Sequence, residues 1–140
     1  MAVNETPIRE ATCACGQLKI RLKGDPVMVS ACCCQQCQKR TGALMGVQAF
    51  FAESQVEATE GTSSRFQRIA ESGNSLDFSF CPKCGSTVWW RAEIRPGTIS
   101  VAVGAFADAD FPAPQRLVWA EHRHPWVVTS VDLPLFEKAP

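Results

Sequence analysis

Eight cysteines, gathered in short clusters, constrain this chain more than any other feature. The clusters lie in three regions of the sequence, Cys13 and Cys15, then Cys32, Cys33, Cys34 and Cys37, then Cys81 and Cys84. The N-terminal segment lacks the apolar middle of a secretory signal, so we expect a cytoplasmic protein, where structural disulfides are rare. Inert buried thiols have no reason to cluster, and these clusters therefore indicate metal ligation.

The segment Cys81-Pro-Lys-Cys84-Gly85 is the most specific half of a metal site. Two thiolates with this spacing on a tight turn can reach one tetrahedral ion, and the glycine allows the positive φ that such a turn often needs. A tetrahedral zinc needs two further ligands, which must come from the other clusters.

Spacing alone leaves two pairings open. In the first pairing Cys13 and Cys15 close a four-thiolate structural zinc site, and Cys32, Cys34 and Cys37 form a second site with one coordination position free. In the second pairing Cys34 and Cys37 join the half-site in a two-knuckle ribbon. An open position distinguishes a catalytic zinc from a structural one, so the pairing decides the function.

Cys33 is expected to differ from its neighbours. Alternate side chains of an extended segment share a face, so Cys32 and Cys34 point one way and Cys33 points the other. We predict that Cys33 is a small packed thiol rather than a ligand.

Alternating apolar and polar residues predict a mainly β, antiparallel fold with short helical turns. Leu18, Ile20 and Leu22 alternate with polar residues in a period of two, which is typical of a half-buried strand. Similar patterns predict strands at 27–31, 76–80 and 98–103 and weaker ones at 47–51, 65–69, 87–91 and 117–120, with short helices or turns at 35–41 and 53–60 and a surface loop at 108–114. The length and the lack of a linker predict one domain over residues 1–140.

Charge and hydropathy bear on the partners. Lys plus Arg number 14 and Asp plus Glu number 14, so no net field attracts nucleic acid or an anionic membrane. No apolar run is long enough to cross a bilayer. We expect a small-molecule partner, no nucleic acid and no membrane, and the sequence does not define an oligomeric state.

The clusters stand in a recognisable order, Cys13-Ala-Cys15-Gly16, Cys32-Cys-Cys34-Gln-Gln-Cys37-Gln-Lys39, Phe80-Cys81-Pro-Lys-Cys84-Gly85-Ser86 and a later His124-Pro125-Trp126. This order resembles the glutathione-dependent formaldehyde-activating enzyme family, to which centromere protein V is related. The resemblance covers most of the chain, and seven cysteines fall in the family's order and spacing.

The resemblance implies a zinc-bearing β-tent with two zinc ions. Cys13, Cys15, Cys81 and Cys84 would hold a structural zinc. Cys32, Cys34 and Cys37 would hold the second zinc, at the active site. Leu117 departs from the family, whose members often carry a histidine two residues before the aromatic that matches Trp119. Cys33 also stands where relatives commonly carry a histidine or another polar residue.

The implied reaction joins a thiol to an aldehyde. Zinc held by three thiolates still binds and deprotonates an incoming thiol, whose free pKa of about 8.5 leaves little thiolate at neutral pH. By resemblance the activity is that of a carbon–sulfur lyase, in which glutathione adds to formaldehyde and gives S-hydroxymethylglutathione. A zinc-stabilised binding module without catalysis is the alternative. A redox role for Cys34-Gln-Gln-Cys37 lacks the βαβ context of a thioredoxin-like motif.

Glutathione carries two carboxylates, so its site needs cationic donors. Lys39 and Arg40 follow Cys37 directly and are the predicted substrate-binding residues. Further candidates that the sequence does not place are Arg65, Arg68, Arg91, Arg123, Gln35, Gln36, His122 and His124, with Trp89, Trp90, Trp119 and Trp126 as pocket walls.

Overall fold

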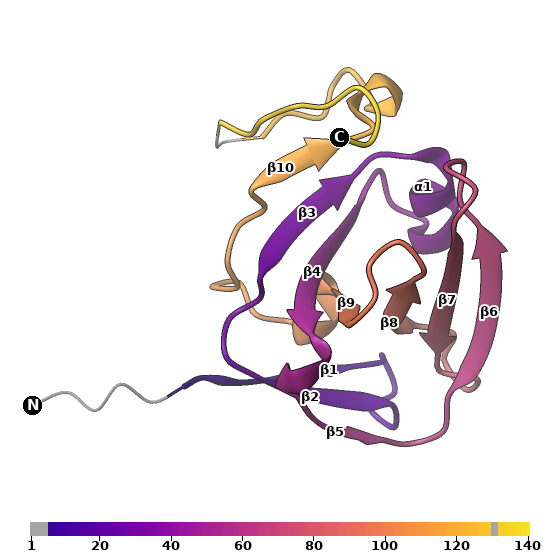
Figure 1. Cartoon of the computed structure of the whole chain (residues 1–140), viewed down its shortest axis with the longest axis vertical. Helices are drawn as coiled ribbons and strands as arrows, with labels where there is room; N and C mark the ends of the chain where they lie inside the picture. Colours follow the sequence, from indigo (N-terminus) through magenta and orange to yellow (C-terminus); the bar gives the residue numbers. More distant parts are fainter. Residues whose placement is uncertain (1–5, 130–131) are drawn as a thin grey trace, which may run out of the picture.

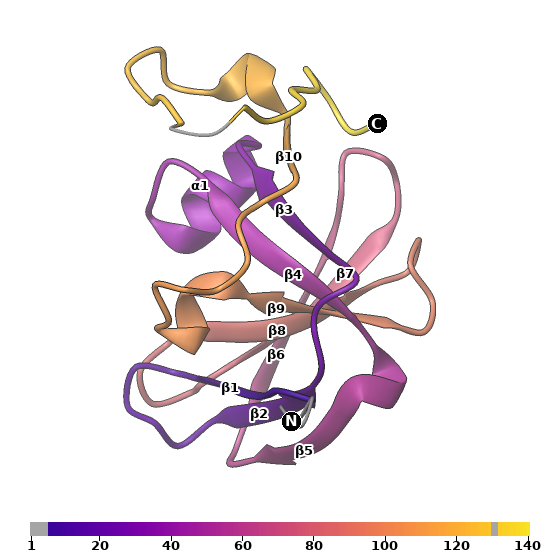
Figure 2. The same cartoon turned by 90° about the vertical axis from the view of Figure 1, so that its left-hand side faces the viewer.

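The computed structural model describes residues 6–129 and 132–140, which form two sheets. The smaller sheet has the order β1-β2-β5, with bounds β1 Ile8–Thr12, β2 Lys19–Lys23 and β5 Val56–Glu60. The larger sheet runs β10-β3-β4-β9-β8-β7-β6, with bounds β10 Arg116–Val118, β3 Met28–Cys32, β4 Gly46–Ala52, β9 Thr98–Ala102, β8 Thr87–Ala92, β7 Ser75–Phe80 and β6 Ser64–Ile69. Figures 1 and 2 show the smaller sheet at one end of the molecule and the C-terminal segment at the other.

The mainly β, antiparallel prediction is confirmed. Strand neighbours in both sheets pair antiparallel, apart from β10, which runs parallel to β3. Each predicted strand is present, and 35–41 is the helix α1 (Gln35–Thr41). Short 3-10 helices are η1 (Glu53–Gln55), η2 (Val103–Phe106) and η3 (Ala120–His122).

Two parts of the prediction need correction. Segment 53–60 is helical only over η1 and continues as strand β5, which pairs with β2. In β5, Val56 and Ala58 are half buried and the two glutamates are exposed. Strand β1 was not predicted, because it contributes only Ala11 as a fully buried side chain and shows no clear alternation. Both segments are outer strands of the small sheet, where few side chains are buried.

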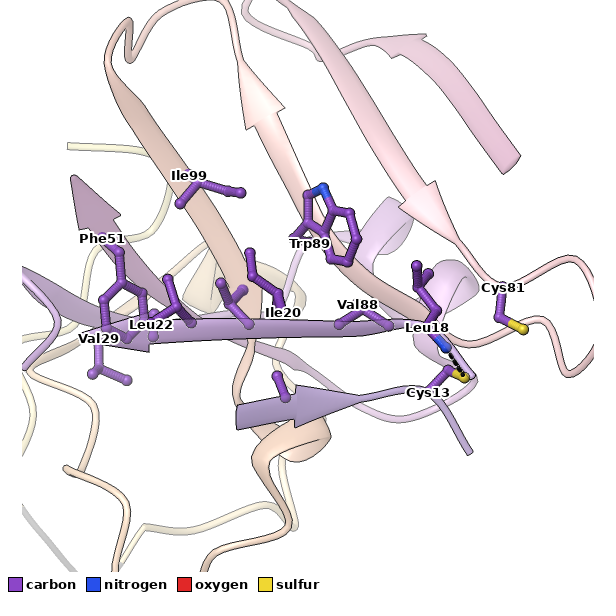
Figure 3. Close-up of a cluster of buried hydrophobic side chains, with 13 residues drawn as sticks. Cys13, Leu18, Ile20, Leu22, Val29, Phe51, Cys81, Val88, Trp89 and Ile99 are labelled. Atoms are coloured by element: carbon purple, nitrogen blue, oxygen red, sulfur yellow. Dashed lines mark hydrogen bonds between the residues drawn. The ribbon is translucent and has the colours of Figure 1, made fainter. Parts of the chain in front are cut away.

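The main core lies between the two sheets. Leu18, Ile20 and Leu22 of the β2 segment pack with Phe51 and Trp89 of the large sheet, and these side chains are buried. Figure 3 shows this cluster, with Cys13 and Cys81 at one end of it. Each large apolar side chain buried in this way contributes about 1.5–3 kcal/mol, so the core fixes how the small sheet sits on the large one.

The opposite face of the large sheet carries a row of mainly aromatic side chains that lines the site described below. Phe50 of β4 is paired with Ser100 of β9, Ser100 with Trp90 of β8, and Trp90 with Phe78 of β7. Because side chains alternate between faces, this row lies on one face, and Phe51 and Trp89 lie on the other. By the same rule Cys32 lies on the face of Phe50, since Met28 is paired with Phe50.

Helix α1 lies in the connection between β3 and β4 and covers part of this aromatic face. It begins after Cys34, whose sulfur accepts a hydrogen bond from the Cys37 backbone N–H at 3.2 Å, and it ends at Gly42 in the left-handed conformation. The Arg40 guanidinium lies 4.5 Å from the Trp90 ring centroid and 5.4 Å from that of Phe78. In the described part of the chain no helix is long and apolar enough to cross a membrane.

The C-terminal segment extends the sheet beside β10. The Leu117 N–H donates to the Pro134 carbonyl at 3.0 Å, and the Phe136 N–H donates to the Leu117 carbonyl at 2.9 Å. Leu133 packs against the cluster formed by Leu117 and Cys33. These contacts hold β10 in place, which matters because β10 borders the site described below.

Candidate functional site

The first cysteine cluster joins the β1–β2 turn to the β7–β8 turn. Its four sulfur atoms, from Cys13, Cys15, Cys81 and Cys84, lie within 4.8 Å of one another. The Cys13–Cys15 and Cys15–Cys81 sulfur distances are 3.6 and 3.7 Å. Zn–S bonds of about 2.3 Å place the sulfurs of a tetrahedral site about 3.8 Å apart, so this cluster fits zinc without rearrangement.

Hydrogen-bond donors surround the sulfurs of this cluster, and they lower the pKa of Cys81 and Cys84. The Leu18 N–H donates to the Cys13 sulfur at 3.3 Å, and the Gln17 side chain donates to the Cys81 sulfur at 3.0 Å. Hydrogen bonds from Ser86 lower the pKa of Cys84 to about 5. Deprotonated sulfur is the form that binds a metal, and four such donors leave no open coordination position.

The second cluster consists of Cys32 at the end of β3, Cys34 at the N-cap of α1 and Cys37 in its first turn. Their sulfurs also lie within 4.8 Å of one another, and no fourth Cys, His, Asp or Glu among the described residues joins them. Hydrogen bonds from the Cys32 and Cys37 thiols lower the pKa of Cys34, and the charge of Arg68 lowers it further. Three sulfur donors fit zinc with one position of a tetrahedron left for a ligand.

The structure groups the cysteines as in the first of the two pairings that spacing left open. Cys13 and Cys15 meet the half-site, whereas Cys34 and Cys37 lie in the other cluster, so the arrangement does not match a two-knuckle ribbon. Cys33 belongs to neither cluster and is fully buried against Ala31, on the side of the sheet that its position in the strand predicts.

A cavity of about 280 Å³ adjoins the three-cysteine cluster. Cys32, Cys34 and Cys37 line it, and its floor includes the row of Phe50, Ser100, Trp90 and Phe78 on the aromatic face of the large sheet. The three-cysteine cluster therefore borders a partly open cavity that a small molecule can enter.

Four arginines line this cavity, namely Arg40, Arg68, Arg95 and Arg116, and all four are half buried. Among the described residues none of them forms an ion pair with a carboxylate. Glu71, which is exposed, is the single acidic residue of the described chain in the lining. A chain of zero net charge thus concentrates positive charge at one place, which favours an anionic ligand.

The predicted substrate-binding residues separate in the structure. Arg40 lines the cavity, while Lys39 is exposed and lines a neighbouring space. Of the other candidates, Arg68 lines the cavity, whereas Arg65 pairs with Asp77. Gln36 lies in the lining too, and Arg91 pairs with Glu53.

Sequence reasoning missed Arg95 and Arg116. Arg95 lies in the β8–β9 turn, and Arg116 lies in β10, which pairs with β3 across a long stretch of sequence. No local pattern marks either residue. Only the pairing of Arg116 with Ser30, two residues before Cys32, brings it to the cysteine cluster.

Trp119 borders the three-cysteine cluster in a strained conformation. Its φ of 56° and ψ of 39° are left-handed, which is rare for a residue with a side chain. Its side chain packs against Cys32, Cys37 and Val118 and stacks on His122, with ring centroids 6.1 Å apart. Trp90 also lines the cavity, but Trp89 lies in the core and Trp126 is exposed.

Leu117 occupies the position where the resemblance leads us to expect a histidine. Its side chain is fully buried with Ala31 and Cys33, on the opposite face of β10 from Val118 and the cavity. A side chain at position 117 therefore does not face the three-cysteine cluster in this fold.

The fold and the two clusters define a class of protein, a small mainly β protein with two cysteine sites of zinc-binding geometry, one of them open to a cavity. Comparison with known proteins gives the family. Residues 8–122 match the family model described as glutathione-dependent formaldehyde-activating enzyme, and the chain belongs to that family.

A solved structure from Rhodobacter sphaeroides has a similar fold. It is 18% identical in sequence, with a TM-score of 0.56, and the match covers 72% of this chain and 90% of that chain. A search of curated proteins finds none that matches this chain.

Proposed function

We propose that this chain is a zinc-dependent carbon–sulfur lyase that joins glutathione, or a similar carboxylated thiol, to formaldehyde. The S–H group adds across the carbonyl, so a carbon–sulfur bond forms, the C=O π bond breaks and the thiol proton ends on oxygen. The reverse reaction cleaves the same carbon–sulfur bond. One observation carries the proposal, a three-sulfur cluster with a free fourth position on the wall of a cavity lined by four arginines.

Each residue of the three-cysteine cluster has a defined task in this proposal. Cys32, Cys34 and Cys37 would hold the second zinc, and Cys13, Cys15, Cys81 and Cys84 the structural one. When bound by three thiolates, zinc supplies a site that lowers the pKa of an incoming thiol and holds its sulfur. The cluster needs no separate general base in its immediate surroundings for this purpose.

The cavity residues bind and orient the substrate. Half-buried guanidinium groups form charge-assisted, bidentate hydrogen bonds with carboxylates, and the charges of Arg40 and Arg68 also favour the thiolate forms of Cys37 and Cys34, respectively. Trp119 and Trp90 exclude water from the reacting groups. Positioning of thiol and aldehyde together is the main source of acceleration that this arrangement offers.

The chemistry of the two cysteine clusters supports the proposed cytoplasmic location. Both clusters bind metal only when their thiols are reduced. Reducing surroundings maintain such clusters, and they also maintain a thiol substrate.

Exchange spectroscopy of glutathione and formaldehyde tests the proposed activity. The zinc-loaded protein should accelerate interconversion with S-hydroxymethylglutathione, and Cys34→Ala should abolish the acceleration. If a folded protein with two zinc ions leaves the rate unchanged across several thiols and aldehydes, the proposed activity is refuted and the binding-module alternative is favoured.

A further inference from the structure

Two of the cavity arginines form a pair of like charges. Arg95 lies in the β8–β9 turn with its guanidinium 4.2 Å from the centroid of the Phe50 ring. Arg116 donates from Nε to the Oγ of the fully buried Ser30 at 3.1 Å. These contacts fix both guanidinium groups at the cavity wall and leave their terminal nitrogens available.

The pair has no counter-charge of its own. Neither arginine forms an ion pair with a carboxylate in the described segments, 6–129 and 132–140. Burial and the charge of Arg116 both lower the pKa of Arg95. Two half-buried cations in each other's field oppose folding, and an anion bound between them removes that cost.

A second pair lies elsewhere on the cavity wall. The guanidinium groups of Arg40 and Arg68 lie 5.4 and 5.3 Å from the centroid of the Phe78 ring. Arg68 belongs to β6 and Arg116 to β10, and these are the two outermost strands of the seven-stranded sheet (Figure 1). The curved sheet thus brings its opposite edges to one cavity, with an arginine pair at each side.

We propose that Arg95 and Arg116 form a carboxylate subsite separate from that of Arg40 and Arg68, so that the cavity selects thiols with a carboxylate at each end. The identity of the thiol rests on the proposed function, but the binding of a dicarboxylate does not. Glutathione has this form, because its sulfur is on the central residue and its carboxylates are on the two terminal ones. A thiol with one carboxylate fills only one subsite and leaves the other pair uncompensated.

Calorimetric binding of S-methylglutathione tests the subsites without turnover, since this probe has no free thiol. Two analogues remove one charge each, the first with the glycine carboxyl as an amide and the second without the carboxyl of the γ-glutamyl residue. We expect the wild-type protein to bind each analogue about 10- to 100-fold more weakly, as for loss of a charged hydrogen-bonding group. The double variant Arg95→Gln/Arg116→Gln should bind the parent probe, S-methylglutathione, more weakly by a similar factor. It should bind one of the two analogues, and only one, as tightly as it binds the parent probe.

Two further variants make the result decisive. Arg95→Gln alone keeps the Arg116–Ser30 hydrogen bond and tests the subsite if the double variant unfolds. Arg65→Gln removes an exposed arginine that pairs with Asp77 outside the cavity, and it should bind all three probes like the wild-type protein.

The proposal is overturned if Arg95→Gln binds the parent probe with wild-type affinity, or if it retains full sensitivity to both analogues. Loss of sensitivity to both analogues at once would also overturn it, because that result indicates one shared subsite. Selective loss in a protein that fails the exchange assay would refute the proposed activity and leave the subsite proposal standing.

Discussion

Cys32 and Cys33 are neighbours in the chain, but their side chains lie on opposite faces of the seven-stranded sheet. Cys32 packs with Cys37 beside the cavity, and Cys33 is buried with Leu117 behind it. The alternation of an extended segment therefore decides which of two adjacent thiols takes part in the three-cysteine cluster.

The first prediction concerns metal content. Wild-type protein purified without chelator should contain two zinc ions per chain, Cys34→Ala one, and Cys33→Ala two. Cys34 belongs to the three-sulfur cluster, whereas Cys33 lies outside both clusters. Elemental analysis with thiol titration of the folded variants gives the counts. A Cys33→Ala protein with only one zinc would contradict the assignment.

The second prediction concerns the closed cluster. Cys84→Ala should abolish cooperative folding, because structural zinc contributes an apparent 10–16 kcal/mol or so, comparable to the whole stability of a small domain, about 5–15 kcal/mol. Cys84 is exposed, so its loss removes a metal ligand and little packing. Circular dichroism during heating measures the effect, with Cys34→Ala as the matched variant in the other cluster. Equal stability of the two variants would show that the clusters do not divide their roles in this way.

Many of the strands and half of the closed cysteine cluster are predictable from local pattern. The alternation around Ile20 gives β2, and the short spacing of Cys81 and Cys84 gives half of the closed cluster. The partner of that half is a tertiary question, which the spacing left open and the fold answered by pairing the β1–β2 and β7–β8 turns.

The arginine-lined cavity is not predictable in this way. Arg116 reaches it through the parallel pairing of β10 with β3, and Arg95 through a turn between β8 and β9. No sequence pattern within a few residues of either arginine indicates that it reaches the cavity. Arg40 was predictable because it follows Cys37 on one short helix.

The third prediction concerns Leu117. Leu117→His should destabilise the protein by about 2 kcal/mol or more, because the imidazole replaces a fully buried side chain without a polar partner. It should not increase activity, since this position faces away from the cavity. Urea denaturation at several pH values measures the cost.

The pH dependence of Leu117→His has a definite sign. A neutral histidine buried there has a pKa below its unfolded value of about 6.5, so the unfolded state binds more protons. The loss in free energy of unfolding relative to the wild-type protein should therefore grow as the pH falls below about 6.5. A deficit that shrinks on acidification, or a gain in activity, would mean that the side chain reaches the cavity.

The last prediction separates the backbone of Trp119 from its ring. The left-handed conformation of Trp119 destabilises a residue with a side chain by about 1–2 kcal/mol, whereas glycine adopts it without this penalty. Trp119→Gly should therefore be about 1 kcal/mol more stable than Trp119→Ala, although both lack the packing on Cys32 and Cys37.

Both variants should lose affinity for S-methylglutathione to the same extent, about tenfold, because the same aromatic wall is missing from the cavity. Trp126→Ala, which removes an exposed ring outside the cavity, serves as the control and should bind normally. Thermal unfolding and calorimetry measure the two effects separately. Equal stability of the alanine and glycine variants would show that the left-handed backbone at position 119 carries no strain. Wild-type affinity in both variants would show that the indole plays no part in binding the thiol.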